Sequence, residues 1–241
     1  MNFESIIKEL GRENRLLILE SLREDKTPSE IKKELKALGI IKSYITVSRY
    51  LDSLENSGLI ERDKGIFRIT STGNLTLTLM KRFNLYLKTL TRYKEFFSGH
   101  SLEEISQPII EDFYILEKGK LIKDPFSLSL IILKKVKKAS RVRIAVPEVD
   151  MEFLEYIKRV EDLVIFAGNS WEKNGKKLRI PLGLLIVDKN FACVFFPHKD
   201  GSLDMTSAFI SSDINFIEWA ERIFQSYQKE GLQPYKVPQA P

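Results

Sequence analysis

The strongest constraint on the fold comes from residues 27–70, where two amphipathic helical patterns are followed directly by a short hairpin pattern. In "TPSEIKKELKALG", Thr27 precedes Glu30 by three residues, which is the spacing of a capping box, and Pro28 takes the first helical position. The inner stripe of this helix is expected to be Ile31, Leu35 and Leu38. Gly39 then ends the helix, because glycine readily adopts the left-handed conformation found there.

A second helix is expected to begin near Ser43, as its N-cap, and to end at Gly58. Its inner stripe consists of Val47, Leu51 and Leu54. Its outer face carries Ile45, Arg49 and Asp52, flanked by Thr46 and Ser48. Residues 41–50 contain Lys42 and Arg49 but no acid. A helix half without negative charge suits a groove lined by phosphates.

The hairpin follows in "GLIERDKGIFRIT", where residues 59–62 and 66–70 predict two strands. Asp63, Lys64 and Gly65 form the expected tight turn. A positive edge is supplied by Arg62, Lys64 and Arg68.

Two further helical segments, at residues 3–10 and about 13–24, precede these elements. The order of helices followed by a hairpin predicts a winged helix-turn-helix. In that fold the second helix of the turn enters the major groove of DNA, and the hairpin can lie along the backbone.

The charge distribution separates the chain into two parts. The net charge is +5, and residues 1–100 hold 18 Lys and Arg against 13 acids, whereas residues 101–241 hold 20 of each. The excess positive charge therefore lies entirely in the first part. This favours a polyanionic partner for that part and a neutral second module.

Composition excludes several classes of protein. With 241 residues, 43% hydrophobic and 29% charged, the chain is long enough for one large globular domain or two modest ones. It has no run of about 20 apolar residues that would predict a membrane span. The start, "MNFESIIKEL", carries acids and is not expected to be a secretory signal. Cys193 is the single cysteine, so no intrachain disulfide can form, and we expect a cytoplasmic protein.

The stretch "TVSRYLDSLENSGLI" resembles the recognition helix of prokaryotic ArsR-like winged-helix regulators, whose familiar form is T-V-S-R-H-L followed by L-x-x-x-G-L. Tyr50 stands where that pattern often has His. The chain lacks the Cys and His clusters of the metal-sensing members, which argues against regulation by a metal.

A long connecting helix is expected over residues 73–97. Its apolar residues are spaced 4, 3, 4, 3 and 4 apart, as in a heptad seam: Leu79, Phe83, Tyr86, Leu90, Tyr93 and Phe97. The seam can pack within its own chain, or it can pair with a second copy. We favour a homodimer, because two winged helices can span half-sites about 34 Å apart on one face of the duplex.

The second module begins near residue 125 and predicts a mixed sheet with helices packed on it. The expected elements are a helix at 130–139, strands at 141–147 and 162–168 around a helix at 151–160, a polar loop at 169–181, a hairpin at 182–196 turning at Lys189 and Asn190, a strand at 204–212 and a helix at 213–229. The fold class is therefore α+β. The expected domains are 1–72, 73–124, 125–231 and a tail at 232–241.

The second module resembles the effector domain of archaeal winged-helix regulators typified by the methanogenesis regulator of filamentous methanogens. The resemblance rests on "FFSGHSLEEI", "KKASRVRIAVPEV", "LGLLIVDKNFACVFFPHKDG" and "FIEWAERIFQSY". It implies a domain that senses a signal, whose ligand is not generally known. The neutral second module, joined through a rigid helix, separately predicts a small-molecule effector, and its binding residues are unknown.

The sequence does not predict a catalytic site. In "PHKDG", Lys199 is adjacent to His198, whereas phospholipase D enzymes need the lysine two residues after the histidine; His100 has Leu102 at that position. Two histidines and one cysteine predict no metal cluster, and Cys193 in "FACVFF" predicts a buried, inert thiol. We therefore expect neither an enzyme nor a cofactor. Trp171 is expected in a polar loop, where it either lines a ligand site or packs.

The predicted function is sequence-specific binding of double-stranded DNA by a dimeric transcription regulator that does not associate with membranes. The predicted groove contacts are Ser43, Tyr44, Thr46, Ser48 and Arg49, and the predicted phosphate contacts are Lys42, Arg62, Lys64 and Arg68. The alternative is a winged helix that binds another protein in a transcription or signalling assembly without touching DNA. Steep salt dependence distinguishes the first from the second.

Overall fold

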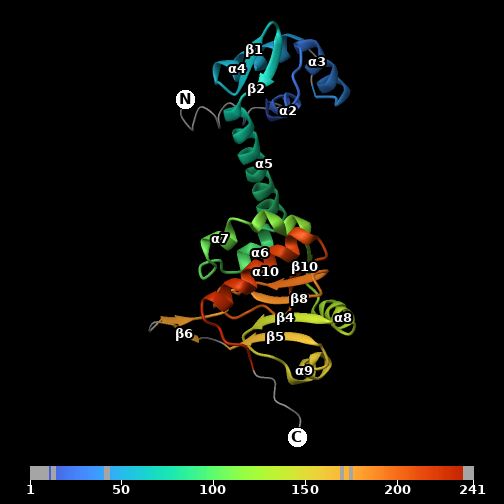
Figure 1. Cartoon of the computed structure of the whole chain (residues 1–241), viewed down its shortest axis with the longest axis vertical. Coiled ribbons are helices and arrows are strands. Elements are labelled where there is room, and N and C mark those ends of the chain that lie inside the picture. Colours follow the sequence, from blue (N-terminus) through green and yellow to red (C-terminus); the bar gives the residue numbers. More distant parts are fainter. Residues whose placement is uncertain (1–10, 12–14, 41–43, 169–170, 174–175, 236–241) are drawn as a thin grey trace. The chain divides into compact units, whose positions relative to one another are not determined.

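The computed structural model describes residues 11, 15–40, 44–168, 171–173 and 176–235. The chain forms two compact units, Met1–Asn84 and Leu85–Pro241. The predicted α+β class is confirmed, because the first unit combines helices with a hairpin and the second combines helices with a mixed sheet (Figure 1). Among the described residues, no helix has both the length and the apolar character needed to cross a bilayer.

The Met1–Asn84 unit follows the order predicted from its sequence (Figure 1). Its described elements are α2 (Arg15–Ser21), α3 (Pro28–Ala37), α4 (Tyr44–Asn56), β1 (Ile60–Asp63), β2 (Ile66–Ile69) and the first part of α5 (Ser71–Arg92). The helix expected at residues 3–10 and the N-cap expected at Ser43 lie outside the described residues.

The start of α3 confirms the predicted capping box. The Thr27 hydroxyl accepts a hydrogen bond from the Glu30 amide, and the Glu30 carboxylate accepts one from the Thr27 amide at 2.8 Å. The hydrogen bond from the Thr27 amide lowers the pKa of Glu30, because it stabilises the ionised carboxylate. At the other end the prediction was wrong for Leu38, which is exposed because it caps the helix end instead of lying within the stripe.

The hairpin turn is tighter than predicted, because Asp63 still pairs with Ile66 and the turn consists of two residues. Lys64 and Gly65 have φ values of 47° and 85°, and two successive positive φ values are typical of a type I′ turn. Lys26 exchanges two backbone hydrogen bonds with Phe67, so the segment before α3 is joined to the hairpin.

One core holds the Met1–Asn84 unit together. Its buried members are Ile18, Leu19, Leu22, Ile31, Leu35, Val47, Leu51, Leu54, Leu59, Ile60, Phe67 and Leu77. The predicted inner stripe of α4 is confirmed, since all three of its residues belong to this core. With that face buried, the opposite face of α4 is held outward.

The Leu85–Pro241 unit is built on a six-stranded sheet with the order β3-β10-β9-β8-β4-β5. The strands are β3 (Lys120–Ile122), β4 (Arg141–Val146), β5 (Asp162–Ala167), β8 (Gly183–Val187), β9 (Phe191–Phe195) and β10 (Ala208–Ser211). Only β4 and β5 run parallel among the paired strands of this sheet in the described part of the chain.

Helices cover both faces of this sheet. The remaining elements of the unit are α6 (Lys94–Gly99), α7 (Gln107–Ile110), the 3-10 helix η1 (Phe113–Lys118), α8 (Pro125–Val136), α9 (Met151–Ile157) and α10 (Ile214–Lys229). On one face, α10 packs with α6, α7 and η1; α8 and α9 pack on the other. Neighbouring residues of β8 therefore enter different cores, Leu184 on the α10 side and Leu185 on the α8 side.

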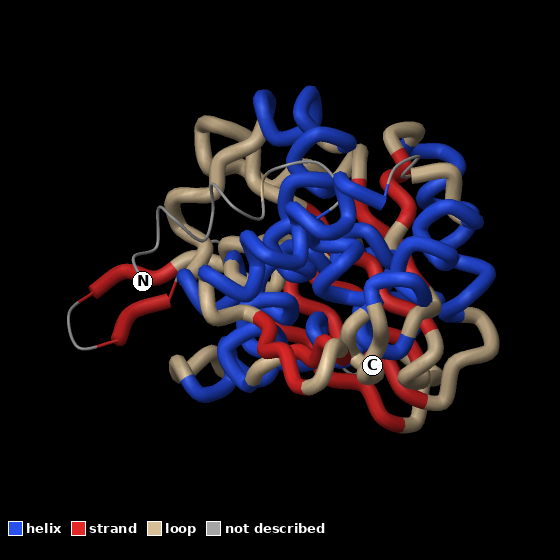
Figure 2. Tube along the Cα trace, turned by 90° about the horizontal axis from the view of Figure 1, so that it is seen from above, coloured by secondary structure: helices blue, strands red, loops and turns tan. Residues whose placement is uncertain are grey.

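The structure corrects four predictions in this unit. The long helix expected at 73–97 breaks at Tyr93. The connector expected at 73–124 is not separate from the second module, because residues 85–124 supply core residues such as Phe113 and the edge strand β3. The loop expected at 169–181 contains a hairpin, β6 (Trp171–Lys173) and β7 (Lys176–Leu178), which stands out from the sheet (Figures 1 and 2). The β8–β9 turn does contain the predicted Lys189 and Asn190, preceded by Asp188. Leu232, placed in the predicted tail, is buried.

Candidate functional site

The outer face of α4 is the first candidate surface for nucleic acid. Ile45, Arg49 and Asp52 are exposed, whereas Thr46 and Ser48 are half-buried. The first turn of α4 contains no acid. This face therefore offers hydroxyl and guanidinium groups at the helix start, with Asp52 one turn further on.

A buried arginine also joins α4 to α2. The Arg15 guanidinium donates a hydrogen bond to the Ser53 hydroxyl at 3.2 Å and lies 5.1 Å from the centre of the Tyr50 ring. Tyr50, which replaces the histidine of the ArsR-like pattern, thus packs against a cation instead of facing outward. This contact helps to fix the orientation of α4 within the unit.

The hairpin supplies the second candidate surface. Arg62 and Lys64 are exposed, and the Arg62 guanidinium lies 5.3 Å from the centre of the Phe67 ring. Among the described residues, no carboxylate forms an ion pair with Arg49, Arg62 or Lys64. Their charges are therefore available to a polyanion.

Arg68 differs from the other predicted phosphate contacts. Its side-chain nitrogens lie 3.5 Å from Asp25, 3.8 Å from Glu61 and 4.0 Å from Asp63. Three carboxylates therefore offset part of the charge of this guanidinium, and the phosphate contact of Arg68 stays a prediction.

Three predicted contact residues have no described side chain. Lys42 and Ser43 lie outside the described residues, and only the backbone of Tyr44 is described, at the start of α4. Their roles stay predictions.

The predicted heptad seam divides into two groups. Tyr86, Tyr93 and Phe97 pack into the core of the Leu85–Pro241 unit; the Tyr86 hydroxyl donates to the Ile110 carbonyl at 2.8 Å, and the Tyr93 ring meets Phe209 edge-on at 4.8 Å. The prediction that these three residues pair between chains is therefore wrong, because their own chain covers them.

The other seam residues are exposed on α5. Leu79, Phe83 and Leu90 have exposed fractions of 57%, 50% and 48%. Leu75 and Leu87 are exposed as well, and Leu75, Leu79, Phe83 and Leu87 follow one another at four-residue spacing. Rows of this spacing form the ridges by which helices pack together.

A cavity of about 380 Å³ lies between α8, α9 and the sheet of the Leu85–Pro241 unit. Its apolar lining includes Leu128, Ile132, Leu133, Ile144, Phe153 and Phe195, and Glu148 and Glu152 also border it. Asp150 borders the cavity too, but its carboxylate caps α9 by accepting from the Phe153 amide at 2.9 Å. The volume falls within the range of small-molecule sites.

The fold also assembles a group that was missed in the sequence. His100, His198 and Asp204 place one possible ligand atom each within 4.8 Å of one another. The expectation that no such cluster forms is therefore wrong. The cluster is not visible in the sequence, because His100 and Asp204 are 104 positions apart along the chain. Burial raises the pKa of Asp204, but hydrogen bonds from Ser207 and Thr206 lower it by more, so the net pKa lies far below its usual value.

The prediction of a buried, inert thiol at Cys193 is confirmed. Cys193 is fully buried, and burial raises the pKa of its thiol, which disfavours the reactive thiolate. Trp219 is buried in the core under α10. The side chain of Trp171 lies outside the described set, so its role stays a prediction.

Comparisons with known proteins give no family. No protein-family model matches the chain, and no curated protein matches it. Among solved structures, one match is TrmBL2, an archaeal chromatin protein whose structure shows a novel mode of DNA binding. The two chains are 14% identical, the match covers 92% of each, and the TM-score is 0.34. A likeness this weak defines neither the family nor the function of this chain.

Proposed function

We propose that the chain is a sequence-specific DNA-binding transcription regulator, that it acts as a homodimer, and that a small molecule bound by the Leu85–Pro241 unit controls it. In this proposal the chain is not an enzyme. The observation that carries the DNA-binding role is α4, which buries Val47, Leu51 and Leu54 while it exposes Arg49 beside the half-buried hydroxyl side chains of Thr46 and Ser48.

Arg49 is the residue proposed to read sequence. Its guanidinium is exposed near the start of α4, and an arginine in the major groove can donate two hydrogen bonds to O6 and N7 of one guanine. Thr46 and Ser48 would contact neighbouring base edges or phosphates. Lys42, Ser43 and Tyr44 precede them and keep the roles predicted from the sequence.

Arg62 and Lys64 are proposed to neutralise backbone phosphates. They are exposed on the hairpin and carry charges that no described carboxylate compensates. Contacts of this kind strengthen binding to every sequence alike, because each one releases counterions from the duplex.

The test selects a preferred duplex from a random library and then measures affinity for that duplex and for a scrambled one by fluorescence anisotropy. Arg49→Ala should lose about 1–3 kcal/mol of discrimination between the two duplexes. Lys64→Ala should weaken both alike. Lys138→Ala, which removes an exposed cation from the other unit, is the matched control and should change neither affinity.

Wild-type affinity of Arg49→Ala for both duplexes would remove Arg49 from the interface. Failure of the wild type to select any duplex would contradict the sequence-specific role and favour a winged helix that binds protein.

The homodimer is proposed to form through the exposed ridge of α5. A water-exposed row of leucines and a phenylalanine at packing spacing is covered when a second copy lies against it. We expect the chain to sediment as a dimer at micromolar concentration and Phe83→Glu to sediment as a monomer, because a buried, unpaired carboxylate is costly. Leu38→Glu, at another exposed leucine, should stay dimeric. A monomeric wild type, with and without DNA, would refute the dimer.

The effector is proposed to be a small, largely apolar molecule in the cavity beneath α8 and α9. The lining is mostly aliphatic and aromatic, and its volume suits such a ligand. A panel of apolar metabolites should contain compounds that raise Tm and change DNA affinity in the wild type. Neither effect should occur in Ser129→Trp, because Ser129 lines the cavity and the indole fills it. Absence of any thermal shift or DNA response across the panel would count against the pocket.

A further inference from the structure

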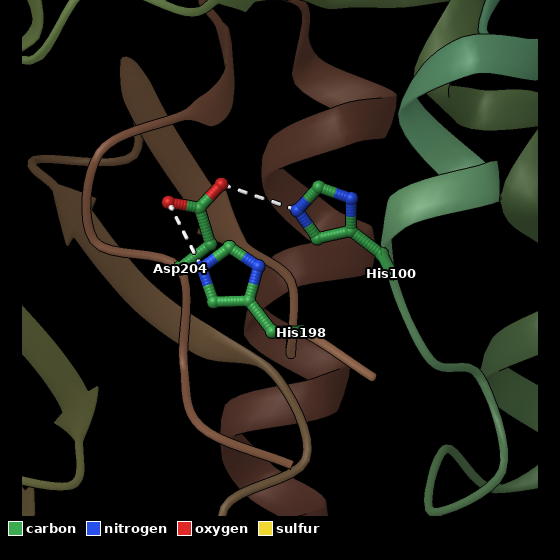
Figure 3. A group of neighbouring side chains, drawn as sticks. All are labelled: His100, His198 and Asp204. Carbon is green, nitrogen blue, oxygen red and sulfur yellow. Dashed lines mark hydrogen bonds and ion pairs between the residues drawn. The ribbon is translucent and has the colours of Figure 1, made fainter. Parts of the chain in front are cut away.

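Both histidines of the chain meet one buried aspartate in the Leu85–Pro241 unit (Figure 3). Nε2 of His100 lies 3.1 Å from Oδ2 of Asp204, and Nε2 of His198 lies 3.8 Å from Oδ1 of the same carboxylate. His100 follows α6, whereas His198 and Asp204 belong to the loop between β9 and β10. An isolated antiparallel β-bridge between His100 and His198 joins these two segments.

The environment of His100 fixes the direction of its lone pair. Nδ1 lies 2.7 Å from the Phe96 carbonyl oxygen, and a carbonyl can only accept, so Nδ1 carries a proton and donates it. In a neutral imidazole, Nε2 then presents a lone pair to the carboxylate. Two acceptors at 3.1 Å require a positive charge between them, either a proton or a metal ion.

Asp204 is held in place by its own loop. Oδ1 accepts hydrogen bonds from the Thr206 amide at 2.8 Å and the Thr206 hydroxyl at 2.6 Å, and Oδ2 accepts from the Ser207 hydroxyl. The Asp204 side chain is 4% exposed and that of His100 is 9% exposed, whereas that of His198 is 47% exposed. Two ligands are therefore preorganised, and the third can rotate from the solvent side.

We propose that Nε2 of His100, Nε2 of His198 and a carboxylate oxygen of Asp204 bind one divalent transition-metal ion of the zinc class, with the remaining position open to water. Imidazole nitrogen and carboxylate oxygen bind zinc at about 2.0–2.2 Å, which places tetrahedral ligand atoms about 3.3 Å apart. Nε2 of His100 is 3.1 Å from Oδ2, Nε2 of His198 is 3.8 Å from Oδ1, and the three possible ligand atoms lie within 4.8 Å of one another. Rotation of the exposed His198 side chain would bring them to the tetrahedral spacing.

The surroundings of the cluster match those of ligated histidines. A metal-bound histidine usually donates its other ring N–H to a carbonyl or carboxylate, as Nδ1 of His100 does to the Phe96 carbonyl. The ion would link the segment after α6 to the β9–β10 loop and thereby stabilise the unit. This inference concerns the second unit alone and does not depend on DNA binding.

The test uses the full chain without a histidine tag, stripped with a chelator and then titrated with Zn²⁺ by calorimetry and with Co²⁺ by absorption. The wild type should bind one ion per chain, and Zn²⁺ should raise its Tm. His198→Ala should bind at least about tenfold more weakly, since it loses one of three protein ligands. Lys199→Ala, at the neighbouring exposed position, should bind like the wild type.

Two outcomes would overturn the site. One is a wild type that binds neither ion saturably, which would leave a proton as the charge between His100 and Asp204. The other is a His198→Ala variant with wild-type affinity for both ions. Far-UV circular dichroism of His198→Ala verifies its fold, and the wild-type stoichiometry decides the question even if that variant misfolds.

Discussion

Tyr227 offers a quantitative test of how α10 is attached to the sheet. Its hydroxyl donates to the Leu182 carbonyl at 2.9 Å and accepts from the Leu182 amide at 3.0 Å. Both residues are buried, with exposed fractions of 1% for Tyr227 and 0% for Leu182. Burial raises the pKa of Tyr227 far above its usual value, so the phenol keeps the proton that it donates.

Tyr227→Phe keeps the ring and removes both hydrogen bonds. It leaves one buried amide and one buried carbonyl of Leu182 without partners, at about 1–3 kcal/mol each. Loss of the buried hydroxyl itself offsets part of this cost. We therefore expect the free energy of unfolding to fall by about 2–4 kcal/mol.

Urea unfolding followed by tryptophan fluorescence measures this change in the correct unit, because both tryptophans, Trp171 and Trp219, belong to Leu85–Pro241. The matched control is Tyr93→Phe, since its hydroxyl is 3.5 Å from the Gly119 carbonyl and forms a poor hydrogen bond. A loss for Tyr227→Phe no larger than that for Tyr93→Phe would refute the reasoning.

Two further predictions concern stability. A Cβ at Gly73 would lie 2.0 Å from the Leu59 carbonyl oxygen, so Gly73→Ala should destabilise the Met1–Asn84 unit by about 1–3 kcal/mol. Amide hydrogen exchange in this unit should become faster, and protection equal to that of the wild type would contradict the prediction. Asp213 caps α10: burial raises its pKa, but hydrogen bonds from Asn215 outweigh this and lower it. Because the pKa of Asp213 is lower in the folded state, its carboxylate stabilises the fold at pH values above the unfolded pKa of about 3.9. This stabilisation is lost as the pH falls. The free energy of unfolding of Asp213→Asn should therefore fall less steeply than that of the wild type as the pH drops from about 5 to about 3. A pH dependence equal to that of the wild type would contradict this role of Asp213.

Much of the Met1–Asn84 unit could be predicted because its signals are local. The capping box of Thr27 and Glu30 and the stripe of Val47, Leu51 and Leu54 depend on residues three or four apart, which the helix period brings together. Each therefore appears directly in the sequence.

What the sequence could not show depends on distant neighbours. A heptad pattern marks Tyr93 and Leu90 alike as apolar, but only the fold reveals that Tyr93 is covered by its own chain while Leu90 is exposed. The sequence also does not show that Asp25 lies beside Arg68 and offsets part of its charge. The cluster around Asp204 was missed for the same reason, since His100 comes from a segment far from the loop that holds His198 and Asp204.

The measurement that tests the central claim most directly is the salt dependence of duplex binding. If Arg62 and Lys64 neutralise phosphates, the logarithm of the binding constant should fall linearly with the logarithm of salt concentration. For Lys64→Ala the slope should be shallower by about one unit. Binding of the wild-type chain that does not change with salt would contradict the DNA interface and leave the winged helix as a protein-binding module.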